Sequence, residues 1–441
     1  MKIFVVVLLC LLGFSLTFQG YGQVKPGRLL TNQQISDLVD SVSASLKKHY
    51  IFPDKADAMV KYMKAQLQKG VYKKLVNPQQ LAQQIHNDIR GIHYDAHLHI
   101  AYEPQMQAPK ALSPEQLARA RKEELSAEKE NNFNLQKVEV LPGNIGYFRF
   151  NGFTSQTAAA QATLNAALTF LSNTKVLMID LRFNGGGSAT APLSSYFFKD
   201  KTHLFDNVNT FSKDTLSFYT DPSSTTGLVL TMPVYIITSK NTASAAEAFS
   251  ASMQALKRAT IVGDTTLGVS HQTGFFPLGN GFLAKIPFAR PVSTSVFKDW
   301  EGTGVIPDVV ITEEKGLVGA QEIVYRDLMQ KAATDKEKKA IQWAINDLKA
   351  SADLPNPEPG VLNNYAGTYA GGINFFVEGG GLRCKNPERG GNDVFKLKPV
   401  TDHVFVLDEN VQVEFVKDLS GNYSSMNMLW KNGNIIQRNK E

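Results

Sequence analysis

The spacing of apolar residues near the start of the chain predicts helices. Between residues 31 and 49, apolar side chains recur every three or four positions and so share one helix face; they are Ile35, Leu38, Val39, Val42 and Leu46. A second such stretch follows Pro53, and a third opens with Asn77 and Pro78, a capping residue followed by proline at the first helical position. Residues 27–102 are therefore predicted to form an N-terminal helical domain.

The pattern changes from helical spacing to alternation over residues 92–102, as expected for a strand. Side chains in a strand alternate with period two, so one face would carry four polar groups: His93, Asp95, His97 and His99. A metal site is one interpretation of this face. Solvated or packed histidines are the other.

A linker or surface arm is expected at residues 103–136, where three prolines precede a charged stretch of helical pattern. Residues 137–315 then alternate between short apolar runs and helical stretches. The apolar runs are expected to be buried strands at 145–150, 176–181 and 234–237, with a turn at 184–187 and a helix from about Ala189. This order predicts an α/β core with a largely parallel sheet and right-handed crossovers.

The last third of the chain predicts a different architecture. Residues 316–352 have the charge and spacing of helices, and 353–360 form a proline-rich linker. From 361 to 441, short alternating runs lie between Gly and Asn turns. That pattern predicts a small antiparallel β-domain, for which a barrel is one arrangement.

The N-terminus is typical of an exported protein. Lys2 precedes an apolar stretch over residues 3–16, and small residues lead to Gly22, which predicts a signal peptide at 1–22. Its removal would take Cys10 and leave Cys384 as the single cysteine. We expect a periplasmic or secreted protein with no integral membrane segment after signal removal. The net charge of +5 is spread out, which argues against a nucleic-acid partner.

Ser244 is the first candidate for chemistry. It follows the apolar run 234–237 and opens a helical stretch that extends to Leu256. The start of a helix gathers unpaired N–H groups and the positive end of the helix dipole. A serine there can act as a nucleophile whose tetrahedral product meets ready donors. Ser244 and Glu247 also match a helix capping box, so a purely structural role is the alternative.

Three other segments carry candidate residues. The run of three glycines at 185–187 follows a buried strand, so it forms either an oxyanion hole from a glycine N–H or a plain tight turn. The nucleotide-binding patterns with a following Lys or with Gly-x-Gly-x-x-Gly spacing do not fit it. His271 lies in a short segment after Gly268. Glu301, in a glycine-rich loop, is either a surface charge or the partner of a catalytic histidine.

Taken together, these segments resemble the S41 serine peptidases, which include the tail-specific peptidases, tricorn protease and the interphotoreceptor retinoid-binding proteins. The resemblance extends over about residues 30–315 and includes, in order, 95–97, 146–153, 180–187, 242–247, 258–268 and 301–308. It implies a ClpP/crotonase-like core preceded by a helical domain.

One departure from the tail-specific peptidases is informative. Their serine pairs with a lysine, and Val269 occupies that position here, which excludes a Ser–Lys dyad. The tricorn and retinoid-binding branch uses a histidine from the N-terminal segment and a glutamate near the end of the core. His97 and Glu301 stand at those places. Tricorn has a serine immediately before its histidine, where this chain has Ala96.

The resemblance therefore implies an exported serine peptidase that hydrolyses unfolded proteins or peptides. It implies Ser244 as nucleophile, His97 as general base and Glu301 as the group that orients the base. It further implies oxyanion donors at the N–H groups of Gly186 and Ala245, with no metal or organic cofactor. His271 is kept as an alternative base or substrate-binding residue.

Two other functions stay open. A non-catalytic carrier of an apolar ligand or peptide on the same scaffold is the main alternative, because retinoid-binding relatives share this fold. A metal hydrolase at His93, His97 and His99 is the other, and it predicts loss of activity with a chelator.

Overall fold

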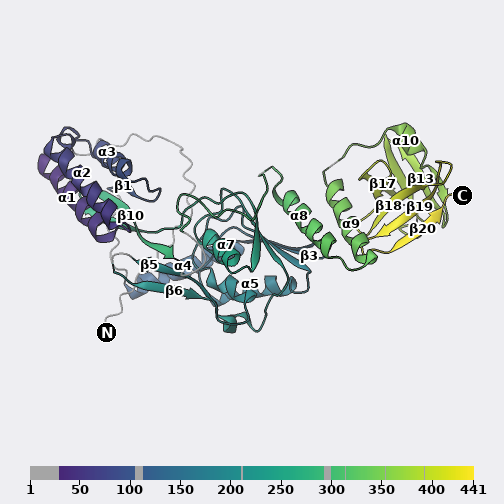
Figure 1. The fold of residues 1–441 in the computed structure, drawn as a ribbon, viewed down its shortest axis with the longest axis horizontal. Helices are drawn as coiled ribbons and strands as arrows, with labels where there is room; N and C mark the ends of the chain where they lie inside the picture. The colour runs from purple at the N-terminus through teal and green to yellow at the C-terminus, as the bar shows by residue number, and fades with distance from the viewer. Residues whose placement is uncertain are drawn as a thin grey trace. The chain divides into compact units, whose positions relative to one another are not determined.

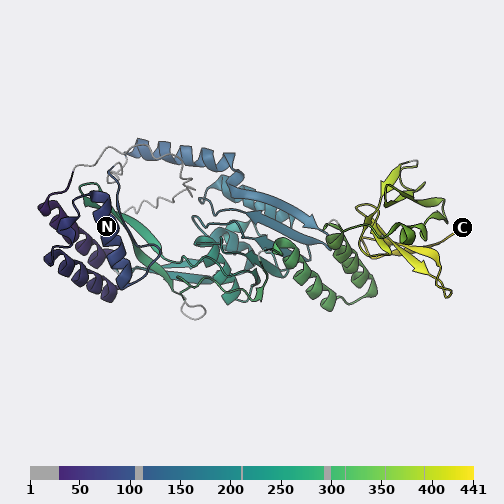
Figure 2. The same ribbon diagram turned by 90° about the horizontal axis from the view of Figure 1, so that it is seen from above.

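The computed structural model describes residues 29–104, 113–209, 212–292, 299–312, 314–352, 354–391 and 393–441. The expected signal peptide at 1–22 lies outside these residues. Within them, no helix is both long enough and apolar enough to cross a membrane. Contacts divide the chain into two compact units, the first comprising Met1–Val138, Phe148–Ser172 and Ile179–Val310, and the second Glu139–Tyr147, Asn173–Met178 and Ile311–Glu441. Figures 1 and 2 show the elements of both units.

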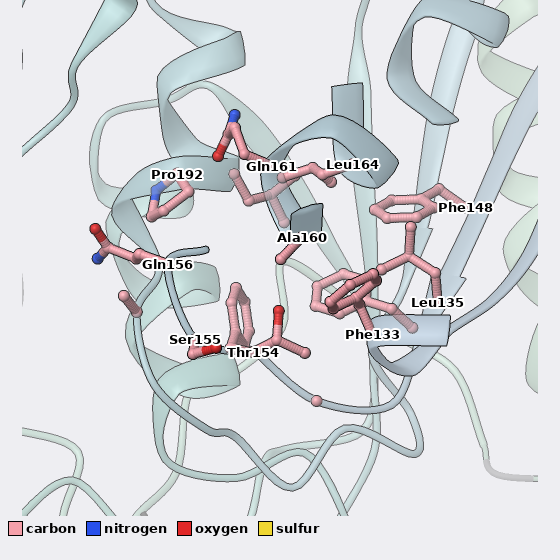
Figure 3. A pocket seen from close by; sticks show the side chains of 15 residues that line it. Phe133, Leu135, Phe148, Thr154, Ser155, Gln156, Ala160, Gln161, Leu164 and Pro192 are labelled. Carbon is pink, nitrogen blue, oxygen red and sulfur yellow. The ribbon is translucent and has the colours of Figure 1, made fainter. Parts of the chain in front are cut away.

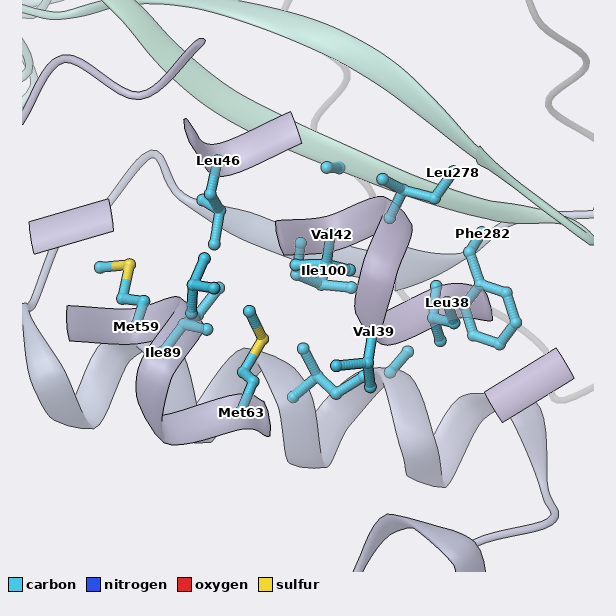
Figure 4. Close-up of a cluster of buried hydrophobic side chains, with 14 of the residues drawn as sticks. Leu38, Val39, Val42, Leu46, Met59, Met63, Ile89, Ile100, Leu278 and Phe282 are labelled. Atoms are coloured by element: carbon cyan, nitrogen blue, oxygen red, sulfur yellow. The ribbon is translucent and has the colours of Figure 1, made fainter. Parts of the chain in front are cut away.

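The predicted N-terminal helices are confirmed. They are α1 (Asn32–His49), α2 (Pro53–Gln68) and α3 (Pro78–Ile92), the purple helices of Figure 1. Thr31 and Gln34 cap α1 reciprocally, and Asn77 Oδ1 accepts the Gln80 N–H at the start of α3. Apolar side chains of the three helices point into one core together with Leu278 and Phe282 (Figure 4). This core holds the strands that follow in place.

Those strands belong to an antiparallel sheet that the sequence pattern did not reveal. The sheet runs in the order β1-β10-β5-β6, with β9 also paired to β10. Its members are β1 (His99–Tyr102), β5 (His203–Asn209), β6 (Thr215–Tyr219), β9 (Gln272–Gly279) and β10 (Phe282–Val292). The long strand β10 pairs with three partners, which is how residues far apart in sequence come together here.

The expectation of a His-bearing strand over residues 92–102 is wrong in its extent. The strand begins only at His99, because α3 continues to Ile92 and the His93 N–H still bonds Ile89 O. Between them the chain turns, with Asp95 Oδ1 accepting the His97 N–H at 2.9 Å. The four polar residues therefore do not share a strand face.

The predicted α/β core is confirmed. A six-stranded sheet has the order β11-β8-β7-β4-β3-β2, and β7 pairs in parallel with β8, as β8 does with β11. Its strands are β2 (Leu135–Leu141), β3 (Ile145–Phe150), β4 (Val176–Asp180), β7 (Val234–Thr238), β8 (Ala259–Gly263) and β11 (Val309–Val310). Helices α5 (Ala158–Phe170) and α7 (Ala245–Ala255) connect strands of this sheet.

Two segments differ from or extend the expectation. The helix expected from about Ala189 is only the short α6 (Ala191–Ser194), followed by a 3-10 turn at Ser195–Phe197. The expected arm contains α4 (Pro114–Glu130), a helix without a buried residue. Near its end, Glu128 accepts hydrogen bonds from the N–H and hydroxyl of Ser155.

The second unit contains the predicted helices and the antiparallel β-domain. Its helices are α8 (Gly316–Lys331), α9 (Asp335–Ala350) and α10 (Pro359–Asn363), so α10 already begins within the expected linker. One sheet holds β12 (Gly367–Tyr369), β13 (Ile373–Glu378), β14 (Gly381–Lys385) and β15 (Val394–Lys396). The other holds β16 (Lys398–Pro399), β17 (Val404–Val406), β18 (Val411–Lys417), β19 (Tyr423–Trp430) and β20 (Ile435–Asn439).

The turn before β3 groups with the second unit because Gly143 packs against helices α8 and α9. A Cβ on Gly143 would lie 3.1 Å from the Tyr325 ring and 3.6 Å from Ala344 Cβ. The Tyr325 hydroxyl also donates to Pro142 O at 2.9 Å. This contact explains why residues 139–147 do not group with the rest of the predicted core.

Candidate active site

Ser244 lies exposed at the first turn of α7, in an unusual backbone conformation. Its φ is 55° and its ψ is −117°, a combination that is strained for a residue with a Cβ. Its N–H donates to Glu247 Oε2 at 2.8 Å, so the Ser–Glu capping relationship predicted from sequence exists through the carboxylate. Helix capping and an accessible hydroxyl therefore occur in the same residue.

Two backbone groups lie beside Ser244. The Ala245 N–H has no acceptor among the residues that the structure describes. Gly186 packs directly on this turn: a Cβ there would lie 2.7 Å from Ser244 Cβ and 3.0 Å from Ala245 N. Only glycine fits at this approach, and its φ of 101° requires glycine as well.

The Gly186 N–H, expected to be a free donor, has a partner. It donates to Asn184 Oδ1 at 2.9 Å, while Asn184 Nδ2 donates to Phe150 O at 3.1 Å. Asn184 is fully buried, and because its side-chain amide bonds both Gly186 and Phe150, it fixes the conformation of the glycine turn. The structure thus brings Gly186 to Ser244 as expected, but with its N–H engaged. Sequence reasoning did not assign a role to Asn184.

His97 and Glu301 meet, although 204 positions separate them in the chain. His97 Nδ1 lies 3.0 Å from Glu301 Oε1, and the two side chains are 15% and 16% exposed. His97 also lines a cavity of about 350 Å³ together with Phe275 and Lys285. The pair is therefore formed in the free protein and is reachable from solvent.

Glu301 is held by further donors. Its Oε2 accepts the N–H groups of Ser270 at 2.7 Å and His271 at 3.1 Å. Burial alone would raise the pKa of Glu301, but the hydrogen bond from His97 and the charge of His271 outweigh it and lower the pKa. The carboxylate is therefore ionised when it faces the imidazole.

His271, the alternative base or substrate-binding residue predicted from the sequence, packs beside His97 and is almost fully buried. Its side chain is 2% exposed, and its Nε2 lies 3.0 Å from Asp299 Oδ2. Burial alone would lower the pKa of His271, but the hydrogen bond to Asp299 and the nearby carboxylates of Asp95 and Glu301 outweigh it and raise the pKa to about 9. The His271 ring is thus less accessible to a substrate than that of His97, whose side chain is 15% exposed. Asp299 was not identified from the sequence, although it precedes Glu301 by only two positions.

One loop joins the serine and the histidine regions. Glu247 Oε2 accepts both the Ser244 N–H and the Val269 N–H, and the next two residues of that loop donate to Glu301. No hydrogen bond links Ser244 to His97 within the described part of the chain. The Ser244 backbone, through Glu247, and the His97 side chain, through Glu301, are thus both linked to residues 268–271.

A small pocket lies next to Phe153. It has a volume of about 50 Å³, and its lining combines Phe133 and Phe148 with the polar side chains of Gln156 and Gln161 (Figure 3). Phe153 connects it to the turn, because its N–H donates to Gly186 O at 2.7 Å.

Comparison with known proteins places the chain in one family. A sequence profile described as peptidase family S41 matches residues 144–311, and one described as the N-terminal domain of peptidase S41 in eukaryotic IRBP matches residues 29–142. The chain belongs to peptidase family S41, as the resemblance of its motifs indicated.

Individual relatives agree with this assignment. The chain is 26% identical over 180 residues to a carboxy-terminal-processing protease of Bartonella bacilliformis, covering 39% of this chain and 40% of that protein. It is 27% identical over 177 residues to the chloroplastic carboxyl-terminal-processing peptidase 2 of Arabidopsis thaliana, covering 38% and 33%. The matches thus span two fifths or less of these relatives.

Solved structures with similarity include a putative peptidase from Parabacteroides merdae, at 17% identity and a TM-score of 0.44 over 66% of this chain and 92% of that one. The photosystem II D1 C-terminal processing protease gives 15% identity and a TM-score of 0.42 over 64% and 94%. Tricorn protease gives 14% identity and a TM-score of 0.38 over 65% and 35%.

Proposed function

We propose that this chain is a serine peptidase in which Ser244 attacks the peptide carbonyl, His97 is the general base and Glu301 orients the base. The observation that carries the proposal is the exposed, strained Ser244 at a helix start, beside the open Ala245 N–H and the glycine turn. The His97–Glu301 pair, which is already formed in the free protein, supplies the general base and the carboxylate that orients it. Family membership makes a polypeptide the expected substrate.

The orientation of His97 fits the role of general base. Because Nδ1 faces the ionised Glu301, it carries the ring proton, and Nε2 is left as an acceptor. In the proposed reaction, the bond from Ser244 Oγ to the carbonyl carbon forms as the hydroxyl proton moves to Nε2. That proton then goes to the leaving amine, and water repeats the sequence to release the acid.

In this proposal, the hydrogen bond between Ser244 and His97 forms only when a substrate is bound. Ser244 and His97 are not hydrogen-bonded in the free protein, and catalytic hydrogen bonds commonly tighten only when substrate is bound. Residues 268–271, bonded to Glu247 at one end and Glu301 at the other, keep the two halves in register.

The Ala245 N–H is the first oxyanion donor in this proposal. Gly186 is the second, and its N–H can act only by sharing or leaving its bond to Asn184. Each such donor typically contributes about 3 kcal/mol to lowering the barrier. The developing negative charge on the oxyanion supplies the driving force for that exchange.

A carrier function has less support. The pocket beside Phe153 measures only about 50 Å³, whereas sites for small-molecule ligands are typically about 300 Å³ or larger. The cavity of about 350 Å³ beside His97 reaches that size, but its lining includes the polar side chains of Glu103 and Lys285, which do not suit an apolar ligand. Export to the periplasm or the medium is part of our proposal, and it rests on the basic and apolar character of residues 1–22.

The test is a pair of serine variants. Ser244→Ala should abolish both digestion of an unfolded protein and labelling by a fluorophosphonate, while circular dichroism stays unchanged. Ser223→Ala, which removes an exposed hydroxyl in another loop, should leave both unchanged. Undiminished proteolysis or labelling by the Ser244 variant would end the proposal.

A further inference from the structure

We propose that the cluster around the His97–Glu301 pair also binds a divalent zinc-type cation, through one donor atom from each of four residues: Asp95, His97, His271 and Glu301. We call these four residues the His–carboxylate cluster. The arrangement predicted from the sequence was different: Asp95 and His97 are shared, but His93 and His99 are not members, and His271 and Glu301 take their place.

The spacing of the donor atoms fits tetrahedral coordination. His97 Nδ1 lies 3.0 Å from Glu301 Oε1 and 3.9 Å from Asp95 Oδ1. His271 Nδ1 lies 3.6 Å from Glu301 Oε2 and 3.9 Å from Asp95 Oδ2. With one donor atom taken from each residue, all four atoms lie within 4.8 Å of one another. Donors at about 2.0–2.1 Å from a tetrahedral zinc are roughly 3.3 Å apart, so side-chain movements would bring the four to one ion.

The state of His271 Nδ1 is the second observation that points to a ligand. This nitrogen is buried and has no hydrogen-bond partner, on a side chain that is only 2% exposed. It faces two carboxylates at distances too long for hydrogen bonds. A zinc ion placed between these groups would displace the proton that the metal-free ring carries on Nδ1 and would give this nitrogen the partner that it lacks.

The residues that contact the four proposed ligands are also of the kind found around metal sites. His271 Nε2 bonds Asp299 at 3.0 Å, and a carboxylate on the far nitrogen is the usual partner of a metal-binding histidine. Asp95 is held by the Tyr50 hydroxyl at 3.0 Å. The ring and carboxylate are thus oriented before any ion arrives, and the partly exposed His97 gives access from solvent.

Metal binding would switch off the base. An imidazole bound through Nδ1 carries its proton on Nε2, so His97 could no longer accept the Ser244 proton. The ion would also take Glu301 away from the ring. We therefore infer that zinc and substrate turnover exclude each other. This consequence rests on the proposed function, whereas binding of the ion does not.

Binding is tested on the Ser244→Ala protein after treatment with a chelator. Isothermal calorimetry with Zn²⁺ should give one site per chain, and Co²⁺ should give the intense visible absorption of a tetrahedral complex. Absence of a stoichiometric site, or a six-coordinate Co²⁺ spectrum, would overturn the assignment.

Ligand variants locate the site. His271→Gln and Asp95→Asn, made in the same background, should each weaken Zn²⁺ binding at least tenfold, and Asp299→Asn should weaken it about tenfold. His203→Gln is the matched control, because His203 also pairs with a carboxylate, Asp206, at 2.8 Å in strand β5. Should His271→Gln fail to fold, His97→Gln, at a partly exposed position, serves instead. Unchanged affinity in the folded ligand variants would refute the site.

A labelling experiment on the wild-type protein separates the two proposals. Zn²⁺ should slow fluorophosphonate labelling of Ser244 at least tenfold, and excess chelator should restore it. If the metal-free protein is not labelled at all, the peptidase proposal fails, while calorimetry still decides the metal site. Labelling that continues unchanged on the fully zinc-loaded protein would refute the inhibition.

Discussion

Ser244 and Val269 donate their backbone N–H groups to the same atom, Glu247 Oε2, at 2.8 and 2.9 Å. By the motif resemblance, Val269 takes the position at which the tail-specific peptidases carry a lysine. In this chain that position contributes its backbone to the turn that carries Ser244. The adjacent Ser270 and His271 then bond Glu301, so the loop links the serine turn to the His97–Glu301 pair.

Glu247 should be critical for stability. Its carboxylate is fully buried and also accepts the Thr266 hydroxyl at 2.6 Å and the Gly268 N–H at 2.7 Å. Glu247→Ala would leave four donors without an acceptor, so we expect a loss of about 3 kcal/mol or more in the free energy of unfolding. Urea denaturation measures this loss in the free energy of unfolding. Glu337→Ala, which removes the partly exposed capping glutamate of α9, should change stability little; equal losses in both variants would contradict this role.

Gly186 and Gly185 should respond differently to alanine. A Cβ at Gly186 would lie 2.7 Å from Ser244 Cβ and 2.8 Å from Ala243 O, whereas a Cβ at Gly185 meets no atom within 4 Å. Gly186→Ala must therefore displace the serine turn, and we expect fluorophosphonate labelling to slow about 100-fold or more. Gly185→Ala should be labelled at a near-normal rate. The idea would be wrong if the two neighbours behaved alike.

The His271–Asp299 pair should make stability depend on pH in the metal-free protein. The pKa of His271 is raised from 6.5 to about 9, so its contribution is full below pH 6.5 and is lost as the pH rises through 9. The pKa of Asp299 is lowered from 3.8 to about 2 because hydrogen bonds to His271 and Ser270 outweigh its burial. Its contribution is present above pH 3.8 and is lost as the pH falls through 2.

We therefore expect the free energy of unfolding, measured with excess chelator, to fall between pH 6.5 and pH 9. Each pKa unit corresponds to about 1.4 kcal/mol at most. His271→Asn should flatten this part of the profile. A profile with the same slope in both proteins would show that His271 is not the titrating group.

Cys384 should be unreactive in the folded protein. It is fully buried in strand β14, and burial raises the pKa of its thiol to about 12. In a Cys10→Ser protein, a thiol reagent at pH 8 should label Cys384 only after denaturant unfolds the β-domain. Rapid labelling without denaturant would show that this strand opens readily or packs differently.

The sequence predicted the elements whose signals are local. The apolar stripe from Ile35 to Leu46, the caps at Thr31 and Asn77, and the buried runs before Asn184 and Ser244 all reflect contacts within a few residues. Helix periodicity and capping residues can be recognised directly in the sequence, so these helices and strands occur where they were expected.

The antiparallel sheet around β10 was not predicted from the sequence. Strand β10 pairs with β1 and β5, which lie far from it in the sequence, so these pairings have no local signal in the residue pattern. The error at residues 92–102 has a similar origin. Alternation there suggested a strand, but the side chain of Asp95 bonds the His97 N–H and turns the chain instead.

By itself, the sequence determined the α/β core, the helical and β-rich ends, the serine at the helix start and, through motif resemblance, the membership in family S41. The resemblance also implied that Glu301 orients His97, but tertiary structure alone decided the distance between them, the burial of His271 against Asp299 and the hydrogen bond from the Gly186 N–H to Asn184. The physical reason is that such pairings depend on directions and distances set by packing of segments up to 204 positions apart, which residue spacing does not encode.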